Sequence, residues 1–341
     1  MAPTNMVIDA DLRSRVVDGV LRQLHAHYIF PDTATAMEQD IRRRMGKGEY
    51  DVITSGAVLA AALTAHLQEV SHDKHLRVFF SPEPRPVRET GEPSPEEREE
   101  FNRHGMLHNY GFKKVERLVG NIGYLELHEF FPAEIGDAGA TAVAAMNFLA
   151  HTDALIVDLR QNGGGDPTMI ALISSYLFAE RVHLNSLYWR DGDRTEQFWT
   201  LAYVPGKRYG DKPVYILTSS NTFSGAEEFT YNLKNLKRAT IVGETTGGGA
   251  HFTLRFPIHE HFGVGIPAGR AISPITGTNW EGTGVTPDIA VRQERALTTA
   301  HILALKDVIE RAGDHPVGPL KDVIDEARAA LAELEKRQPK S

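Results

Sequence analysis

Cysteine is absent from all 341 residues of this sequence. Without a thiol the chain can form no disulfide, has no thiolate nucleophile and cannot bind zinc through cysteine. Any covalent catalysis must therefore use another side chain. The absence of cysteine also fits a reducing compartment.

Targeting signals and an excess of positive charge are missing as well. The first residues, MAPTNMVIDADLRS, lack the basic and apolar regions of a secretory signal, and no later run is long enough to span a bilayer. The net charge of −8 gives no electrostatic footprint for nucleic acid or an anionic membrane. We therefore expect a cytoplasmic protein with no nucleic-acid partner and no membrane partner.

The length of the chain predicts more than one domain, because a single hydrophobic core stops growing below this size. Apolar residues recur at spacings of three and four in the first part, which predicts an N-terminal helical cap domain over 1–80. Residues 81–114 are rich in proline and charge, which is typical of a linker, here ending in a short helix. We expect an α/β core over 115–295 and a C-terminal helical segment over 296–341.

Strand-like and helical segments alternate within the expected core. This order favours a largely parallel sheet covered by helices, the α/β class. The expected strands are NIGYLEL, ALIVDLR, PVYILTSS and ATIVGE, and the expected helices cover 138–149, 167–178 and 225–236.

Loops rich in small residues follow the last three of these strands: DLRQNGGGDP, TSSNTFSGAEE and GETTGGGAH. Catalytic groups of open α/β sheets gather beyond the carboxyl ends of the strands, so we expect the loops to face one crevice. Gly163, Gly164 and Gly165 would let backbone amides turn inward and stabilise an oxyanion, although a tight turn explains them equally well. Neither nucleotide-binding glycine motif is present at these loops.

Ser224 lies between an expected strand and an expected helix. With Glu227 three residues later it forms a capping-box pattern, which is the simpler interpretation of this serine. The alternative is a nucleophile at a helix N-terminus, with the Gly225 amide beside it to hold an oxyanion. A nucleophile also needs a base.

Four motifs in order carry a family resemblance: VDLRQNGGG, TSSNTFSGAEEF, ATIVGETTGGGA and TGTNWEGTGVTPDI. They resemble the serine peptidases that comprise tail-specific (C-terminal processing) proteases and the tricorn core protease, together with the interphotoreceptor retinoid-binding protein modules. VLRQLHAHYIFPD and SHDKHLRV resemble the N-terminal part of the retinoid-binding-protein-like branch, so the likeness covers nearly the whole chain. It implies a crotonase-like or ClpP-like ββα spiral core, with Ser224 as nucleophile and no cofactor.

The family has two solutions for the base. Tail-specific proteases use a lysine in the loop that here reads GETTGGGA, where Gly249 takes its place, and no lysine lies between Lys237 and Lys306. The tricorn-like solution uses a histidine and a late glutamate, whose positions match His75 and Glu281. The resemblance thus implies a site of Ser224, His75 and Glu281, with the amides of Gly225 and Gly164 or Gly163 as the oxyanion hole.

Two departures from the family pattern stand out. Tricorn-like enzymes have a serine beside the base histidine, whereas this sequence has Lys74. Between the helical cap and the core there is no room for a PDZ domain, so recognition of substrate C-termini in the tail-specific manner is not expected.

Three histidines raise a metal alternative. His259 and His261 alternate along an expected strand and His251 lies a few residues earlier, so three imidazoles would be available to zinc. Solvent-facing histidines beside a hairpin turn explain the pattern without a metal, and we expect none.

The sequence therefore favours a serine hydrolase, a peptidase, acting on a peptide or a small acyl or apolar substrate. A carrier of retinoid-like or fatty-acid-like ligands is the main rival, since the retinoid-binding modules use the same fold without hydrolysis. A biosynthetic enzyme that reuses the oxyanion hole on an acyl substrate is a third hypothesis. Crotonase-like folds often assemble, so a further copy of the chain is a candidate partner, in a homo-oligomer.

Overall fold

The computed structural model describes residues 5–85 and 94–337. Part of the predicted linker, 86–93, lies outside these ranges. The chain forms two compact units. The first comprises Met1–Ser94, Ser186–Glu196 and His251–Ile272, and the second comprises Pro95–Asn185, Gln197–Ala250 and Ser273–Ser341.

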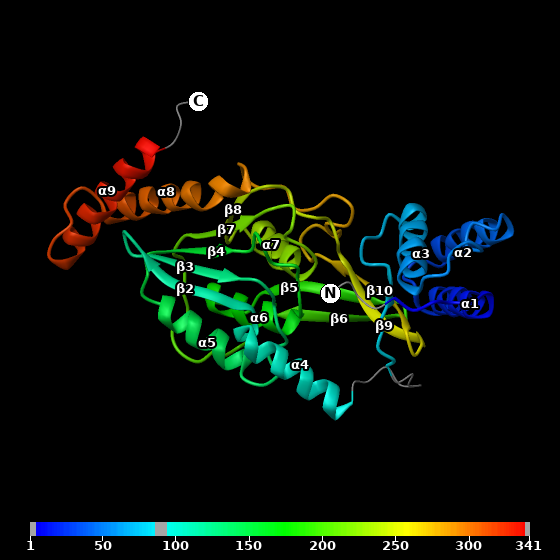
Figure 1. The fold of residues 1–341 in the computed structure, drawn as a ribbon. Helices are drawn as coiled ribbons and strands as arrows, with labels where there is room; N and C mark the ends of the chain where they lie inside the picture. Colours follow the sequence, from blue (N-terminus) through cyan, green and yellow to red (C-terminus); the bar gives the residue numbers. More distant parts are fainter. Residues whose placement is uncertain (1–4, 86–93, 338–341) are drawn as a thin grey trace. The chain divides into compact units, whose positions relative to one another are not determined.

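Three helices open the first unit (Figure 1): α1 (Ala10–His27), α2 (Pro31–Gly46) and α3 (Gly56–Ser71). Polar caps start two of them, because the Asp9 carboxylate accepts the Leu12 N–H at 2.8 Å and the Ser55 hydroxyl accepts the Val58 N–H at 3.2 Å. Their apolar faces pack together and against β1 (Arg77–Phe80) and β10 (Phe262–Ile272). These helices therefore bury the three- and four-residue pattern seen in the sequence.

A five-stranded sheet completes the first unit. β10 pairs antiparallel with β1, with β9 (His251–His259) and with the end of β5 (His183–Trp189), which is followed by β6 (Arg194–Trp199). The segment 1–80 is thus only part of this unit. Strand pairing recruits residues far along the chain, which helical periodicity does not reveal.

The second unit is built on a six-stranded sheet with the order β11-β8-β7-β4-β3-β2. Four pairs are parallel, and only β2 runs antiparallel to its neighbour. This confirms the expected α/β class with a largely parallel sheet. The strands are β2 (Phe112–Leu118), β3 (Ile122–Leu127), β4 (Ala154–Asp158), β7 (Val214–Thr218), β8 (Thr240–Gly243) and β11 (Ile289–Ala290).

Helices cover both faces of this sheet (Figure 1). On one face Leu125, Leu155 and Val157 pack under α5 (Ala138–Leu149), α6 (Pro167–Leu177) and α7 (Gly225–Asn235). On the other, Tyr124 and Ile156 pack against α8 (Gln293–Ala312) and α9 (Pro319–Arg337). The remaining helical elements of this unit are α4 (Pro95–Leu107) and a 3₁₀ turn, η1 (Asn109–Gly111). Successive residues of these strands therefore pack into two different hydrophobic cores, one on each face of the sheet.

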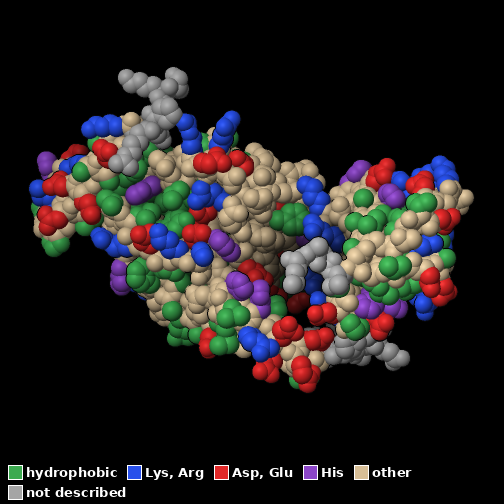
Figure 2. Space-filling model, viewed as in Figure 1, with side chains coloured by type: hydrophobic (Ala, Val, Ile, Leu, Met, Phe, Trp, Pro, Cys, Tyr) green, Lys and Arg blue, Asp and Glu red, His purple; other side chains and the backbone are tan. Residues whose placement is uncertain are grey.

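The charged side chains show no broad area of one sign on the face drawn in Figure 2, where acidic and basic groups are interspersed. Among the described residues, no helix combines the length and apolar character that a membrane crossing needs.

Candidate active site

Three loops of the second unit meet beyond the carboxyl ends of β4, β7 and β8. The Phe223 N–H donates to the Asn162 carbonyl at 3.1 Å, which joins the first loop to the second. The Gly247 N–H donates to the Thr222 carbonyl at 2.9 Å, which joins the second to the third. The expectation that these loops gather at one edge is confirmed, as parallel strands require.

Ser224 occupies a strained turn between β7 and α7. Its φ of +54° and ψ of −120° lie outside the extended region that ordinary N-cap residues adopt. The Ser224 N–H donates to Glu227 Oε2 at 2.9 Å, so the glutamate contributes its half of the predicted capping box. A non-glycine residue held at positive φ between strand and helix is the backbone arrangement of a nucleophile turn in hydrolases.

The loop after β4 contains Gly163, Gly164 and Gly165 and is called the glycine loop. It approaches the Ser224 turn so closely that only glycine fits there. Gly164 has a φ of +119°, and a Cβ at this position would lie 2.7 Å from Ser224 Cβ and 2.9 Å from the Gly225 nitrogen. Gly165, at a φ of +137°, has its nitrogen 2.9 Å from where a Gly225 Cβ would stand. The two loops therefore place several backbone amides close to Ser224.

Not all of these amides are available to a ligand. The Gly164 N–H donates to Asn162 Oδ1 at 2.8 Å, within its own loop. Among the described residues, the amides of Gly163, Gly165 and Gly225 have no acceptor. Gly164 therefore contributes its conformation, while its neighbours and Gly225 have N–H groups to offer.

Glu281 lies in the same unit, beside the third loop. Its Oε2 accepts the Ala250 N–H at 2.5 Å. The preceding residue, Trp280, donates its indole N–H to the Gly249 carbonyl at 2.7 Å, and the Gly282 N–H donates to the Gly248 carbonyl at 3.1 Å. The loop that carries Glu281 is thus fixed to 248–250 along its length.

His75 belongs to the first unit, in the short loop between α3 and β1. The Asp73 carboxylate holds its backbone, because Asp73 Oδ1 accepts the His75 N–H at 3.0 Å. Burial lowers the pKa of the His75 imidazole to about 4, and the nearby His251 adds to this effect against the charge of Asp73. The imidazole is therefore neutral at pH 7, as a general base must be. Its pairing with Ser224 stays a prediction.

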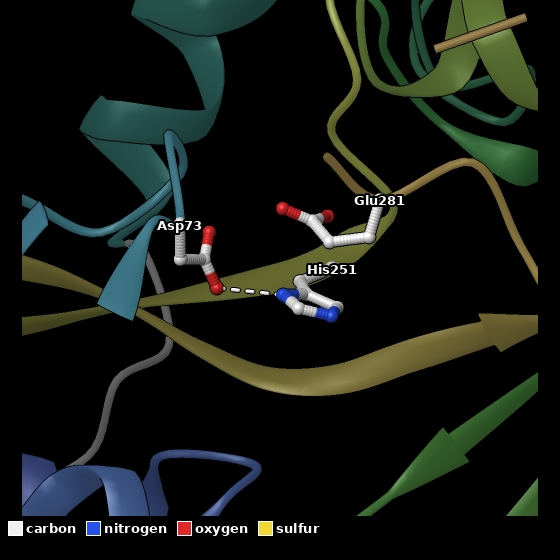
Figure 3. A group of neighbouring side chains, drawn as sticks. All are labelled: Asp73, His251 and Glu281. Carbon is white, nitrogen blue, oxygen red and sulfur yellow. Dashed lines mark hydrogen bonds and ion pairs between the residues drawn. The ribbon is translucent and has the colours of Figure 1, made fainter. Parts of the chain in front are cut away.

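Asp73 and His251 form a buried pair in the first unit that the sequence did not single out as such. Asp73 is 1% exposed, and its Oδ2 lies 2.6 Å from His251 Nδ1 (Figure 3). The Tyr28 hydroxyl donates to the same oxygen at 3.3 Å. A carboxylate on one imidazole nitrogen fixes the ring and its tautomer. The position of His251 directly after GETTGGGA was the signal available in the sequence.

Two family models match this chain. The one described as peptidase family S41 matches residues 121–291, half of the chain. The chain belongs to peptidase family S41. A second, described as the N-terminal domain of this family in eukaryotic IRBP, matches residues 11–107. The first range contains Ser224 and Glu281, and the second contains His75.

Curated relatives in family S41 are longer than this chain. A carboxy-terminal-processing protease of Bartonella bacilliformis is 28% identical over 182 residues, which are 52% of this chain and 40% of that protein. A tail-specific protease of Haemophilus influenzae is 29% identical over 141 residues, which are 39% of this chain and 18% of that protein. The chain therefore spans less than half the length of these relatives.

Solved structures support the fold. A lipoprotein from Streptococcus agalactiae superposes with a TM-score of 0.58 at 16% identity, covering 86% of this chain and 96% of that one. The tricorn protease superposes with a TM-score of 0.54 at 13% identity, covering 95% of this chain and 37% of that one. At such identities the likeness concerns the fold alone, and it agrees with a mixed α/β architecture.

The hypothesis that three histidines bind one zinc ion is wrong, because strand β9 holds two of them far apart. His251 and His259 are the first and last residues of β9, which places them about 26 Å apart at the rise of an extended strand. His261 lies in the turn to β10, where its Nδ1 is 2.8 Å from the Ser81 carbonyl. These three histidines cannot share one ion. His259 and His261 flank the hairpin turn between β9 and β10 as expected, but the His261 side chain is only 13% exposed and so does not face solvent.

Glu228 on α7 yields a prediction for the stability of this S41 chain. It is 6% exposed, and burial raises its pKa to about 7, with Asp166 adding to the rise and Asn185 and Asn232 opposing it. The folded chain therefore keeps a proton that the unfolded chain loses, so the free energy of unfolding falls as pH rises from 4.5 to 7.

Glu228→Gln removes this titration and should stabilise the fold by roughly 1–3 kcal/mol at pH 8, with little effect at pH 4.5. Urea denaturation at both pH values measures the change. Glu310→Gln, on the exposed surface of α8, is the control and should shift neither value. Equal gains at both pH values would contradict the prediction.

Proposed function

We propose that this chain is a serine peptidase in which Ser224 attacks the carbonyl carbon of a peptide bond. The observation that carries the proposal is the strained turn of Ser224 with the glycine loop against it. A helix cap alone needs neither positive φ nor a neighbouring backbone at glycine distance. The second unit would then be the crotonase-like core of the family.

The proposed reaction is acyl transfer to serine followed by hydrolysis. His75 takes the proton of Ser224 Oγ as the new C–O bond forms, and the carbonyl oxygen becomes an oxyanion. The amides of Gly225 and of Gly163 or Gly165 stabilise that charge. His75 then protonates the leaving amine as the C–N bond breaks, and a water molecule, activated by His75, releases the acyl group from Ser224. Glu281 fixes the loop at Ala250. The proposal also gives its carboxylate the role of supporting the His75 imidazole as the base.

The third loop has no lysine that could act as the base. Gly249 stands where tail-specific proteases carry their lysine, and its N–H donates to Glu227 Oε2 at 2.8 Å. Lys234, which precedes this region, is paired with Asp288 at 2.6 Å and also donates to the Thr286 carbonyl. A Ser-Lys dyad therefore has no source in this segment.

A groove in the second unit supports a peptide substrate. It has a volume of about 760 Å³ and is lined by residues including Ala133, Thr168, Leu172, Arg181, Trp199 and Leu201. Thr168 follows Gly165 by three residues, so the two lie within about 10 Å of each other. An extended peptide rises about 3.3 Å per residue and would reach the groove a few residues from the bond that Ser224 attacks.

The carrier hypothesis lacks a comparable observation. It expects the Leu- and Val-rich faces of the N-terminal helices to line a lipid pocket. In the structure Leu24, Leu59 and Leu63 are fully buried in the core that these helices form among themselves and with β10. These faces are already occupied by protein.

Reaction with a fluorophosphonate tests the proposed function. Intact mass spectrometry of the wild-type chain at pH 7.5 should show one covalent adduct, and Ser224→Ala should show none. The same pair should differ in cleavage of a quenched fluorescent peptide library. A wild-type chain that forms no adduct at Ser224 would overturn the hydrolase proposal. An adduct without any peptide cleavage would instead favour the hypothesis of a biosynthetic enzyme that acts on an acyl substrate.

A further inference from the structure

The side chain of Glu227 has an environment that a helix cap does not require. It is completely buried, with 0% exposure. Each carboxylate oxygen accepts two hydrogen bonds. Oε1 accepts from the Thr246 hydroxyl at 2.5 Å and the Gly248 N–H at 2.7 Å, and Oε2 accepts from the N–H groups of Gly249 at 2.8 Å and Ser224 at 2.9 Å.

These four donors come from two different loops. Ser224 belongs to the turn after β7, whereas Thr246, Gly248 and Gly249 belong to the loop after β8. A capping box would use only the bond to Ser224. The other three bonds make the carboxylate a bridge between the candidate nucleophile and the neighbouring loop.

The donor set suits an anion. Among the described residues Glu227 has no ion-pair partner, and only N–H and O–H groups and the N-terminal end of α7 face its charge. Burial raises the pKa of Glu227, and all four hydrogen bonds oppose that rise. A neutral amide of the same shape has one acceptor oxygen and an NH₂ group, which would point at two N–H donors.

We infer that Glu227 is a positioning residue of the catalytic site, which holds the backbone of Ser224 in its strained turn and locks the loop of 246–249 against it. The inference rests on the proposed function and deepens it. Glu227 touches no substrate and takes no proton in the reaction. It keeps Ser224 Oγ and the Gly225 amide in the relative positions that attack on a carbonyl requires.

The test compares Glu227→Gln with Glu228→Gln, two buried glutamates that are adjacent on α7. Glu227→Gln should lower the maximal rate of fluorophosphonate labelling by about 10–100-fold and leave the apparent affinity for the probe within about threefold. Glu228→Gln should label at the wild-type rate. Both are measured well below their unfolding temperatures, with circular dichroism as the check on folding.

A milder pair covers the case in which Glu227→Gln does not fold. Thr246→Val removes one donor to Glu227 and also the acceptor of the Val285 N–H, whose bond to Thr246 Oγ1 is 2.7 Å. Thr246→Ser keeps both bonds. Labelling should fall about tenfold or more in the valine variant and stay within about twofold in the serine variant. Where the wild-type chain is labelled, equal rates in the two variants would overturn the inference.

Hydrogen exchange separates this inference from the proposed function. The amides of Ser224, Gly248 and Gly249 should exchange slowly in the wild-type chain and at least tenfold faster in Glu227→Gln or Thr246→Val. This faster exchange is expected even if Ser224 does not react with the fluorophosphonate. An unreactive Ser224 would overturn the hydrolase proposal but not the structural role of Glu227. A folded Glu227→Gln that exchanges these amides and labels as the wild type does would overturn the positioning role.

Discussion

Replacing His75 by alanine should slow the labelling of Ser224 by about 10²–10⁴-fold, the usual contribution of a positioned general base. The proposed reaction requires a group that takes the Ser224 proton. Asp73 fixes the backbone of His75, and burial keeps its imidazole neutral at pH 7. Rate constants for fluorophosphonate labelling of folded protein measure the loss.

The pH profile gives the same prediction a second readout. Because burial lowers the pKa of His75 to about 4, the imidazole stays unprotonated well below the range of an exposed histidine. The labelling rate should be level between pH 8 and about 5.5 and should fall only as pH approaches 4. A decline centred near pH 6.5 would show that the base is less buried than the structure has it.

A histidine three residues earlier supplies the control. His72 is exposed and caps α3 at a φ of +56°, a conformation that asparagine tolerates, so His72→Asn should label at the wild-type rate. If His75→Ala also labels normally, His75 is not the base. His251→Ala then becomes the informative variant, since this ring is the one that Asp73 Oδ2 binds.

Much of the fold follows from sequence periodicity. The segments ALIVDLR and PVYILTSS contain β4 and β7, and the helix expected over 138–149 has these bounds as α5. These elements combine a strong local pattern with burial on both faces of a parallel sheet, so local preference and tertiary packing agree. The turn at Ser224 could be placed for the same reason, since it falls between β7 and α7.

The supporting contacts could not be predicted in this way. Asp73 and His251 are separated by 178 positions, and their hydrogen bond depends on β10 pairing with both β1 and β9. The capping-box pattern predicts Glu227 as a partner for Ser224, but the bonds of Glu227 to Gly248 and Gly249 depend on where the third loop passes. Hydrogen bonds between loops leave no periodic signal in a single sequence.

Each unit holds its own candidate catalytic residue in a similar manner. In the first unit the buried carboxylate of Asp73 accepts the N–H of His75, two residues later. In the second the buried carboxylate of Glu227 accepts the N–H of Ser224, three residues earlier. Both carboxylates also bind a segment distant in sequence. A buried carboxylate with several donors resists displacement because each lost bond leaves an unsatisfied polar group.

Gly164→Ala should disable the site by steric means alone. The new Cβ would lie 2.7 Å from Ser224 Cβ, 2.9 Å from the Gly225 nitrogen and 3.0 Å from the Phe223 carbonyl oxygen, and the φ of +119° is itself strained for alanine. Backbone atoms cannot rotate out of the way as a side chain does. We expect a loss of roughly 2–4 kcal/mol in the free energy of unfolding. Labelling of Ser224 should fall by at least about 10²-fold, because the nucleophile and the oxyanion donors must separate.

Gly163→Ala is the matched control for this substitution, one residue earlier in the same loop. A Cβ at this position meets no atom within 4 Å, and the residue does not have a positive φ. Alanine also keeps the Gly163 N–H, so an oxyanion role for that amide survives. Urea denaturation should therefore show a change below about 1 kcal/mol, with labelling close to wild type. If the two alanine variants instead unfold and react alike, the close approach of the glycine loop to Ser224 is not what shapes the site.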